Sequence, residues 1–437
     1  MNRFVWGVST AAYQIEGAAT EGGRGVSVWD TFCAEPGRIA DGGSGAVACD
    51  HYHRYAEDLD LVAGLGADAY RFSIAWPRIQ PDGRGPANAA GLDFYDRLVD
   101  AALERGIAPV PTLYHWDLPQ PLEDDGGWMN RTTAQRFAEY AGIVAQSLGD
   151  RVAVWGTLNE PFVQMALGYG FGVHAPGRTH GLGSFAAGHH QLLAHGLGTQ
   201  AVRAHSAAPV MLVNTYSPVR PASDAPGDER AASAYDLFHN KMFTDPLLTG
   251  DYPAALLETP GIDPGVVHAG DLAQIAQPLD RLGVNYYQPT VVRAPGPENP
   301  LPFEPGQVEG VPTTGFGWAV VPSGLRDLLV LLRDRYGDAL PPVLVTENGC
   351  SYPDVVGPDG AVDDSDRVAY LDAHIGALRE AVDTGVDVRG YFVWSLVDNF
   401  EWAEGYTQRF GLVHVDYDTQ ARTPKASYAW YRDRIAR

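Results

Sequence analysis

The segments VAVWGTLNEP (residues 152–161) and VLVTENG (residues 343–349) reveal most about the fold of this chain. Each is an apolar run that stops at a glutamate, and the content of Val and Leu with a closing Pro or Gly is typical of a buried parallel strand. In an α/β barrel, catalytic groups lie at the C-terminal tips of such strands. Either glutamate alone could simply bind loop amides. Two in matching contexts favour the paired carboxylates that acid-assisted cleavage of a glycosidic bond requires.

Strand-like and helix-like patterns alternate along the whole chain. We expect strands over residues 4–9, 67–74, 107–114, 152–158, 209–214, 279–287, 343–346 and 388–396. Helical spacing covers residues 50–65, 89–105, 131–148, 182–206, 227–242, 323–336, 364–384 and 423–434. Residues 243–277 form a Pro/Gly-punctuated insertion, and residues 293–322 form a long irregular excursion, which in a compact fold is usually functional.

This alternation predicts a single (β/α)₈ TIM barrel with elongated βα loops, in which residues 1–437 make up one catalytic domain. A doubly wound parallel sheet is the structural alternative. It is weakened because no expected strand is followed by the G-x-G-x-x-G turn of a dinucleotide-binding unit.

Composition narrows the possible partners. With 31 Lys and Arg against 54 Asp and Glu, the formal net charge is -23. Such a charge opposes binding to nucleic-acid phosphates and to anionic membranes, and it also repels acidic substrates. We therefore expect a small neutral substrate, no nucleic acid and no membrane partner. The sequence does not decide between a monomer and a homo-oligomer.

The cysteines and histidines give no sign of a metal or of a disulfide framework. Three widely spaced cysteines lack any C-x-x-C pattern, and the N-terminal residues show no apolar signal segment, so we expect a reduced, cytoplasmic protein. His189, His190 and His195 lie on one expected helix without an E-x-x-H frame, so we interpret them as structural residues. No metal and no cofactor are predicted.

The expected strand tips collect polar and aromatic side chains that a barrel does not need for its stability. A sugar requires aromatic faces for its C–H groups, and amides and carboxylates for its hydroxyls. The side chains at or just after the strand tips are Gln14, Glu16, Arg71, His115, Trp116, Asn159, Glu160, Asn285, Tyr286, Tyr287, Glu347, Trp394, Glu401 and Trp402.

Together these motifs resemble glycoside hydrolase family 1, the β-glucosidase family. The resemblance covers essentially the whole chain, and its specificity lies in seven motifs that occur in the right order at strand ends. They are QIEG (14–17), RFSIAWPR (71–78), HWDLPQ (115–120), TLNEP (157–161), NYY (285–287), TENG (346–349) and WSLVDNFEW (394–402).

The resemblance implies a role for each matching position. Glu160 matches the general acid/base and Glu347 the nucleophile of a retaining, double-displacement mechanism. Arg71 and Tyr287 match the groups that keep the nucleophile ionised and oriented, and Asn159 matches the donor to the sugar 2-OH. The acid should have a raised pKa, because burial and a nearby negative charge both favour its protonated form.

Other matching positions are expected to bind the sugar. Besides Asn159, they are Gln14, His115, Trp116, Asn285, Trp394, Glu401, Trp402 and Trp318. Trp116 could instead support its neighbour His115, and Trp318 could be a packed surface tryptophan rather than part of the leaving-group side. Members of the family that cleave phosphorylated sugars have a serine where this chain has Glu401, so an unphosphorylated sugar is favoured.

The sequence therefore predicts an exo-acting β-glycosidase that hydrolyses terminal β-D-glucosyl residues, with possible activity on β-galactosides or β-fucosides. A transglycosylase would use the same catalyst until the second step and stays open as an alternative. A non-catalytic sugar-binding protein would tolerate damage to the catalytic pair, but both glutamates are present. A lyase or aldolase barrel would need a Schiff-base lysine or metal ligands at a strand end, and neither occurs in the motifs above.

Overall fold

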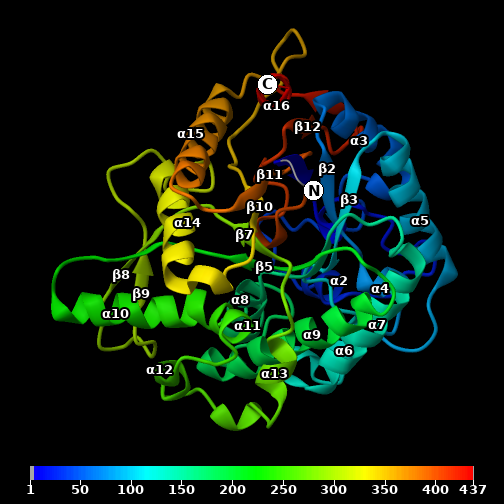
Figure 1. Cartoon of the computed structure of the whole chain (residues 1–437). Coiled ribbons are helices and arrows are strands. Elements are labelled where there is room, and N and C mark those ends of the chain that lie inside the picture. Colours follow the sequence, from blue (N-terminus) through cyan, green and yellow to red (C-terminus); the bar gives the residue numbers. More distant parts are fainter. Residues whose placement is uncertain (1–3, 437) are drawn as a thin grey trace.

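Eight parallel strands close into a barrel in the computed structural model, which describes residues 4–436 (Figure 1). The order around the barrel is β1-β11-β10-β7-β5-β4-β3-β2. The strands are β1 (Val5–Ser9), β2 (Ala69–Ser73), β3 (Ala108–Tyr114), β4 (Trp155–Asn159), β5 (Val210–Thr215), β7 (Arg281–Asn285), β10 (Val343–Asn348) and β11 (Val388–Trp394). Each lies within or next to an expected strand, so the predicted (β/α)₈ fold is confirmed.

Helices surround the barrel (Figure 1), and several of the longer ones, such as α5, α7 and α14, bury one apolar face. The longer ones are α3 (His51–Leu65), α5 (Ala89–Glu104), α7 (Thr132–Leu148), α9 (Phe185–Arg203), α10 (Pro226–Asp236), α14 (Pro322–Tyr336), α15 (Ser365–Asp383) and α16 (Ala426–Ile435). The short ones are α1 (Ala12–Ile15), α2 (Val28–Cys33), α4 (Trp76–Ile79), α6 (Gln120–Asp124), α8 (Pro161–Val163), α11 (Asp245–Leu248), α12 (Ala254–Leu257) and α13 (Asp271–Ile275).

Small and branched side chains fill the barrel interior. Val5, Ala69, Val110, Val154, Met211, Val213, Leu344 and Phe392 form one buried cluster from seven different parts of the barrel wall. Phe392 is the largest of them, and it fits because its neighbour across the strand pair is Gly7. A Cβ on Gly7 would lie 2.3 Å from the Phe392 ring. The closed interior leaves the C-terminal rim as the place for a binding site.

Three features of the loops differ from the sequence prediction. Strands β6 (Val219–Pro221), β8 (Thr290–Arg293) and β9 (Glu304–Gly306) pair into a small sheet that draws on the excursion expected to be irregular. The helix expected over residues 227–242 changes after α10 into a π-helical turn over Leu237–Lys241. The insertion at residues 243–277 contains the short α-helices α11 to α13 and a 3-10 turn over Pro264–Val266.

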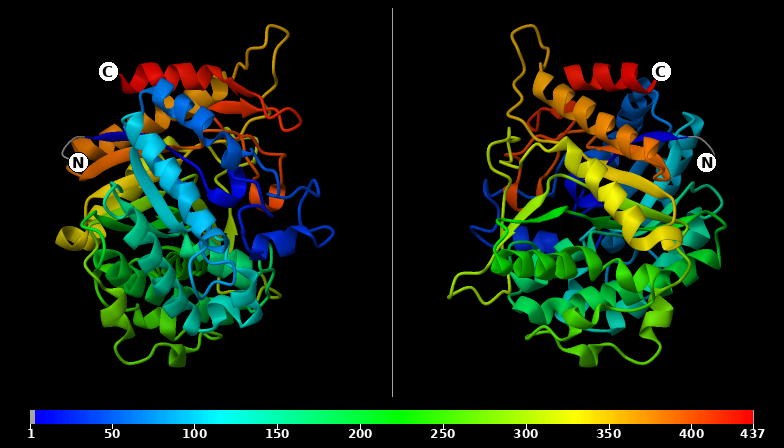
Figure 2. Two further views of the ribbon diagram at one scale, coloured as in Figure 1. Left: turned by 90° about the vertical axis from the view of Figure 1, so that its right-hand side faces the viewer. Right: turned by 60° about the vertical axis from the view of Figure 1, so that its left-hand side comes forward.

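The C-terminal part packs against two other helices and against β1, and it supports the loop after β11. Helix α16 packs beside α15 and α3 (Figure 2), and the hydroxyl of Tyr431 donates to the Gly7 carbonyl at 3.0 Å. The hairpin of β12 (Val413–Val415) and β13 (Arg422–Pro424) leads to Lys425, which is 2% exposed and binds Asp398 at 2.7 Å. Asp398 begins the segment that carries the pocket residues after β11.

Met1, Asn2, Arg3 and Arg437 belong to the predicted domain but lie outside the described residues, and the single-domain organisation stays a prediction. Within residues 4–436, no helix is both long and apolar enough to span a bilayer.

Candidate active site

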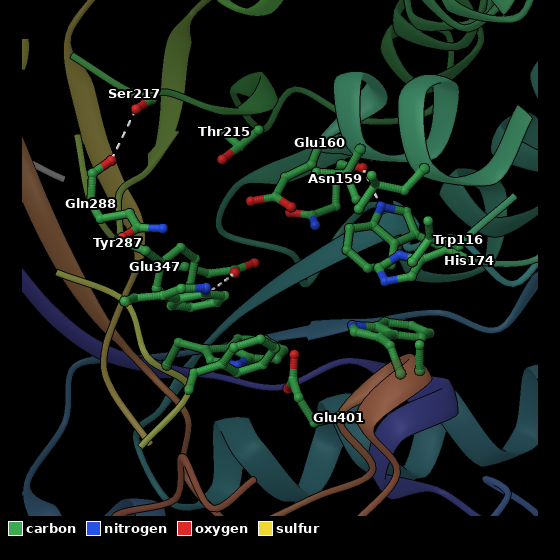
Figure 3. A pocket seen from close by; sticks show the side chains of 18 of the residues that line it. Trp116, Asn159, Glu160, His174, Thr215, Ser217, Tyr287, Gln288, Glu347 and Glu401 are labelled. Carbon is green, nitrogen blue, oxygen red and sulfur yellow. Dashed lines mark hydrogen bonds between the residues drawn. The ribbon is translucent and has the colours of Figure 1, made fainter. Parts of the chain in front are cut away.

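A cavity of about 460 Å³ opens at the C-terminal ends of the barrel strands. Six different strands contribute to its lining at or just after their tips, through His115, Asn159, Thr215, Tyr287, Glu347 and Trp394. Figure 3 shows Glu160, Glu347 and Glu401 extending into this space from three directions. Its volume is in the range of a small-molecule site.

Glu347 lies on β10 with both carboxylate oxygens paired. Arg71 of β2 donates from Nη1 to Oε1 at 2.6 Å, and the Tyr287 hydroxyl donates to Oε2 at 2.8 Å. The Arg71 side chain is 1% exposed and that of Glu347 is 5% exposed, so this ion pair is shielded from water. A charged, hydrogen-bonded pair of this kind fixes the carboxylate in position.

Glu160 has different surroundings. It precedes α8 in a left-handed conformation with φ 46°, which is unfavourable for a residue with a side chain and is typical of functional sites. Its Oε1 accepts from Asn285 Nδ2 at 2.8 Å, and Thr346 fixes the orientation of that amide by donating to Asn285 Oδ1 at 2.7 Å. Burial and the charge of Glu347 raise the pKa of Glu160 to about 8.

The amide of Asn159 links the surroundings of the two glutamates. Its Oδ1 accepts from Arg71 Nη2 at 2.7 Å and from Asn285 Nδ2 at 3.2 Å. Its Nδ2 therefore points the other way and donates to His115 Nε2 at 3.0 Å. Burial and the charge of Arg71 hold the pKa of His115 well below its usual value, so the ring is neutral, with its hydrogen on Nδ1.

Glu401 lines the cavity, and Gln14 lies directly behind it. The Gln14 amide donates from Nε2 to the Phe400 carbonyl at 2.8 Å and more weakly to Glu401 Oε2 at 3.4 Å. Gln14 Oε1 is buried and has no partner within the described part of the chain. Burial and the charge of Glu347 raise the pKa of Glu401 to about 8. Both side chains thus retain capacity for hydroxyl groups.

Aromatic rings line the cavity around Glu401. Trp402 lies 4.6 Å from Trp116 between ring centroids, and His115 stacks against both Trp394 and Trp402 at 5.9 and 5.8 Å. Trp116 also donates from Nε1 to the Asn159 carbonyl at 2.9 Å. It both lines the cavity and supports its neighbours, so the two interpretations of this residue are compatible.

The residues expected at the site come together, but not all of them line the cavity. Gln14, Arg71 and Asn285 lie behind its surface and hold the carboxylates, whereas Trp318 does line the cavity, 5.1 Å from the Tyr287 ring. The sequence analysis did not predict several other residues that line the cavity. Among them are Thr215, Ser217, Tyr235, His239, Gln288 and Phe316. Gln288 follows the NYY motif directly, which could have indicated it.

The histidine cluster has structural contacts away from the cavity. His189 binds the hydroxyl of Tyr252 and the carboxylate of Asp271, and so ties α9 to the insertion before β7. His190 binds the Trp128 carbonyl. Over residues 4–436, no group of three or more His, Cys, Asp or Glu side chains is placed to hold a metal ion.

Comparison with known proteins places this geometry in a family. The model of glycosyl hydrolase family 1 matches residues 1–437. A β-glucosidase of Agrobacterium sp. is 48% identical over 434 residues, which are 98% of this chain and 93% of that protein. A bifunctional β-D-glucosidase/β-D-fucosidase of Bifidobacterium breve is 49% identical over 454 residues, covering 99% of this chain and 97% of its own.

A solved structure agrees with the fold. The β-glucosidase of Thermotoga maritima in complex with glucoimidazole superposes with a TM-score of 0.94 and 42% identity, covering 100% of this chain and 98% of that one. With a closed eight-stranded barrel, two buried glutamates at strand tips and a family match over its full length, the chain is a glycoside hydrolase that belongs to glycosyl hydrolase family 1.

Proposed function

We propose that the protein is a β-glucosidase that removes the terminal, non-reducing β-D-glucosyl residue by double displacement, with further activity on β-fucosides or β-galactosides. The observation that carries this proposal is the unlike surroundings of the two glutamates. Glu347 is paired with the cationic Arg71 and with Tyr287, whereas Glu160 has only the neutral partners Asn285 and Thr215 and a pKa of about 8. Two carboxyls with different environments suit the two roles of a retaining glycosidase.

In the first step, Glu160 gives its proton to the leaving oxygen while Glu347 attacks the anomeric carbon. A pKa of about 8 keeps Glu160 protonated at neutral pH. Once Glu347 is esterified its charge is gone, and one of the two causes of the raised pKa disappears. Glu160 then loses its proton more readily and serves as the base that activates water.

The remaining groups orient the sugar. Asn159 keeps one amide hydrogen beyond its bond to His115, and we assign that hydrogen to the 2-OH. Asn285 positions both Glu160 and Asn159. The other groups assigned to the glucosyl ring are Gln14, His115, Trp116, Trp394, Glu401 and Trp402, and Trp318 is assigned to the leaving-group side.

The names of relatives support the substrate class. The Agrobacterium protein is a β-glucosidase, the Bifidobacterium protein also a β-fucosidase, and the Thermotoga protein binds glucoimidazole. A cytoplasmic location is part of the proposal and rests on the sequence expectation alone. Cell fractionation would test it.

The direct test is hydrolysis by the purified protein. Nitrophenyl β-D-glucoside, β-D-fucoside and β-D-galactoside are assayed together, and the first-formed glucose is followed by NMR. We expect cleavage of the glucoside with the β-anomer released first. Inert glucoside, or α-glucose as the first product, would contradict the proposal.

A further inference from the structure

A second, much smaller cavity lies behind the catalytic one. Its volume is about 10 Å³, which is close to the space that one water molecule needs. Trp116 lines the catalytic cavity and its neighbour Asp117 lines the small one, so the chain after β3 separates the two spaces. We call the small space the Asp117 cavity. Its lining consists of Ala12, Tyr13, Glu16, Gly17, Arg24, Gly45, Ala75 and Asp117.

Asp117 is a buried acid that no other residue binds. The residue is 0% exposed, and neither carboxyl oxygen has a hydrogen-bond partner on another residue within residues 4–436. A buried polar group without a hydrogen bond is costly, so such groups nearly always have a partner. Burial raises the pKa of Asp117 well above its usual value, so the carboxyl keeps its proton and can both donate and accept.

Arg24 supplies a donor to the same cavity. Its side chain is only 4% exposed, and Nη1 binds Asp30 at 2.7 Å. The Nε hydrogen has no partner in the described part of the chain, and no ion pair joins Arg24 to Asp117 there. The guanidinium is therefore close enough to line the cavity with Asp117, but it does not bind that carboxyl directly.

Glu16 supplies an acceptor. The Tyr95 hydroxyl donates to its Oε1 at 2.6 Å, and Arg78 Nε donates to its Oε2 at 3.1 Å. Each oxygen of a carboxylate has two lone pairs, so Glu16 can accept further hydrogen bonds on the side that faces the cavity. The Asp117 cavity thus has a donor, an acceptor and an acid around a space of about one water.

The walls leave no room for a larger ligand. Gly45 and Gly17 bring backbone segments together over the cavity, because a Cβ on Gly45 would lie 2.6 Å from the Tyr13 carbonyl oxygen and one on Gly17 would lie 2.1 Å from the Val47 carbonyl oxygen. A metal cation of similar size would be repelled by the charge of Arg24. A neutral, water-sized ligand fits both limits.

We propose that the Asp117 cavity is a binding site for one structural water molecule, which bridges Asp117 to Arg24 and Glu16. The water accepts hydrogens from Asp117 and Arg24 and donates one of its own to Glu16, within the two to four bonds that buried waters make. It joins the loop after β3, which carries Trp116, to the long segment after β1. The inference does not depend on the proposed activity.

A crystal structure of the unaltered protein, grown in a rubidium salt, tests the site directly. We expect density for one water within about 2.5–3.2 Å of an Asp117 oxygen and of Glu16 or Arg24. An Asp117 cavity without density would overturn the inference. So would an anomalous peak in it, because rubidium scatters anomalously and water does not.

Unfolding in urea tests the bridge through two substitutions of Asp117. Leucine is close to aspartate in shape but cannot bind water. If the acid had no partner, Asp117→Leu would raise the urea midpoint, because it removes a buried polar group. If the water bridges the three side chains, the same change leaves Arg24 and Glu16 without it.

We therefore expect the urea midpoint of Asp117→Leu to fall by at least about 0.3 M. Asp117→Asn keeps a group that binds the water and should lower the midpoint less. The matched control is Asp82→Leu, which removes an exposed carboxyl and should leave the midpoint unchanged. An unchanged or raised midpoint for Asp117→Leu would contradict the bridge. If that variant does not fold, the crystal structure of the unaltered protein decides.

Discussion

Replacing Glu160 by glutamine should slow the enzyme to an extent that depends on the leaving group. Glutamine retains an oxygen that can accept from Asn285 Nδ2, which now lies 2.8 Å from Glu160 Oε1. The side chain is therefore expected to stay in place and lose only the proton that it donates. The variant isolates acid catalysis from positioning.

The size of the effect follows from what that proton does. A positioned general acid contributes roughly 10²–10⁴-fold when the leaving group is a poor one. The alkoxide of a sugar needs the proton, whereas dinitrophenolate departs without it. We expect kcat/KM to fall about 10²–10⁴-fold for cellobiose and less than about tenfold for dinitrophenyl β-D-glucoside. Because Glu160 is also the proposed base, the covalent intermediate should accumulate and give a burst of dinitrophenol.

The assay measures both substrates at one pH, together with a burst experiment. Glu401→Gln is the matched control, because it makes the same chemical change in the same cavity at a residue assigned to the glucosyl ring. Since both substrates share that ring, the control should lower both values of kcat/KM by a similar factor. If Glu160→Gln also lowers the two equally, Glu160 is structural and the reasoning fails.

Three further results are expected. Because the pKa of Glu160 is raised to about 8, kcat/KM should decline as the pH rises through about 8, and a profile flat to pH 9.5 would contradict its role as acid. Lys425→Met should lower the free energy of unfolding by about 1–3 kcal/mol in urea titrations, because Asp354 and Asp398 each lose a buried cationic partner. An unchanged urea midpoint would argue that these ion pairs do not stabilise the loop after β11. Nitrophenyl 6-phosphoglucoside should be a much poorer substrate than the glucoside. Glu401 lines the part of the cavity assigned to the glucosyl ring, and no Lys or Arg occurs among the described residues that line the cavity. A preference for the phosphorylated sugar would overturn this view of the pocket.

The barrel and its catalytic rim could be predicted because their signals are strong and local. Buried parallel strands give unbroken apolar runs, and the glutamates at 160 and 347 end two of these runs. The small sheet of β6, β8 and β9 was missed, since each strand has only three or four residues, most of them partly or fully exposed, and no measurable alternation.

Other residues that line the cavity, such as His239, were not predictable for a different reason. His239 lies in a π-helical turn, where the regular 3.6-residue spacing that the sequence pattern assumes no longer applies. Its imidazole reaches the cavity through a tertiary contact with Phe162 and a bond to Asn240, neither of which leaves a trace in the sequence. Similarly, the raised pKa of Glu401 depends on burial and on the charge of Glu347, a residue far away in the chain.

Azide rescue of Glu347→Ala tests the central claim most directly. This change removes the proposed nucleophile and leaves space beside the cationic Arg71, which is 2.6 Å from Glu347 in the native site. The variant should not hydrolyse dinitrophenyl β-D-glucoside, and added azide should restore release of dinitrophenol with α-glucosyl azide as the product. Near-normal hydrolysis by Glu347→Ala without azide, or a β-configured azide product, would contradict the account.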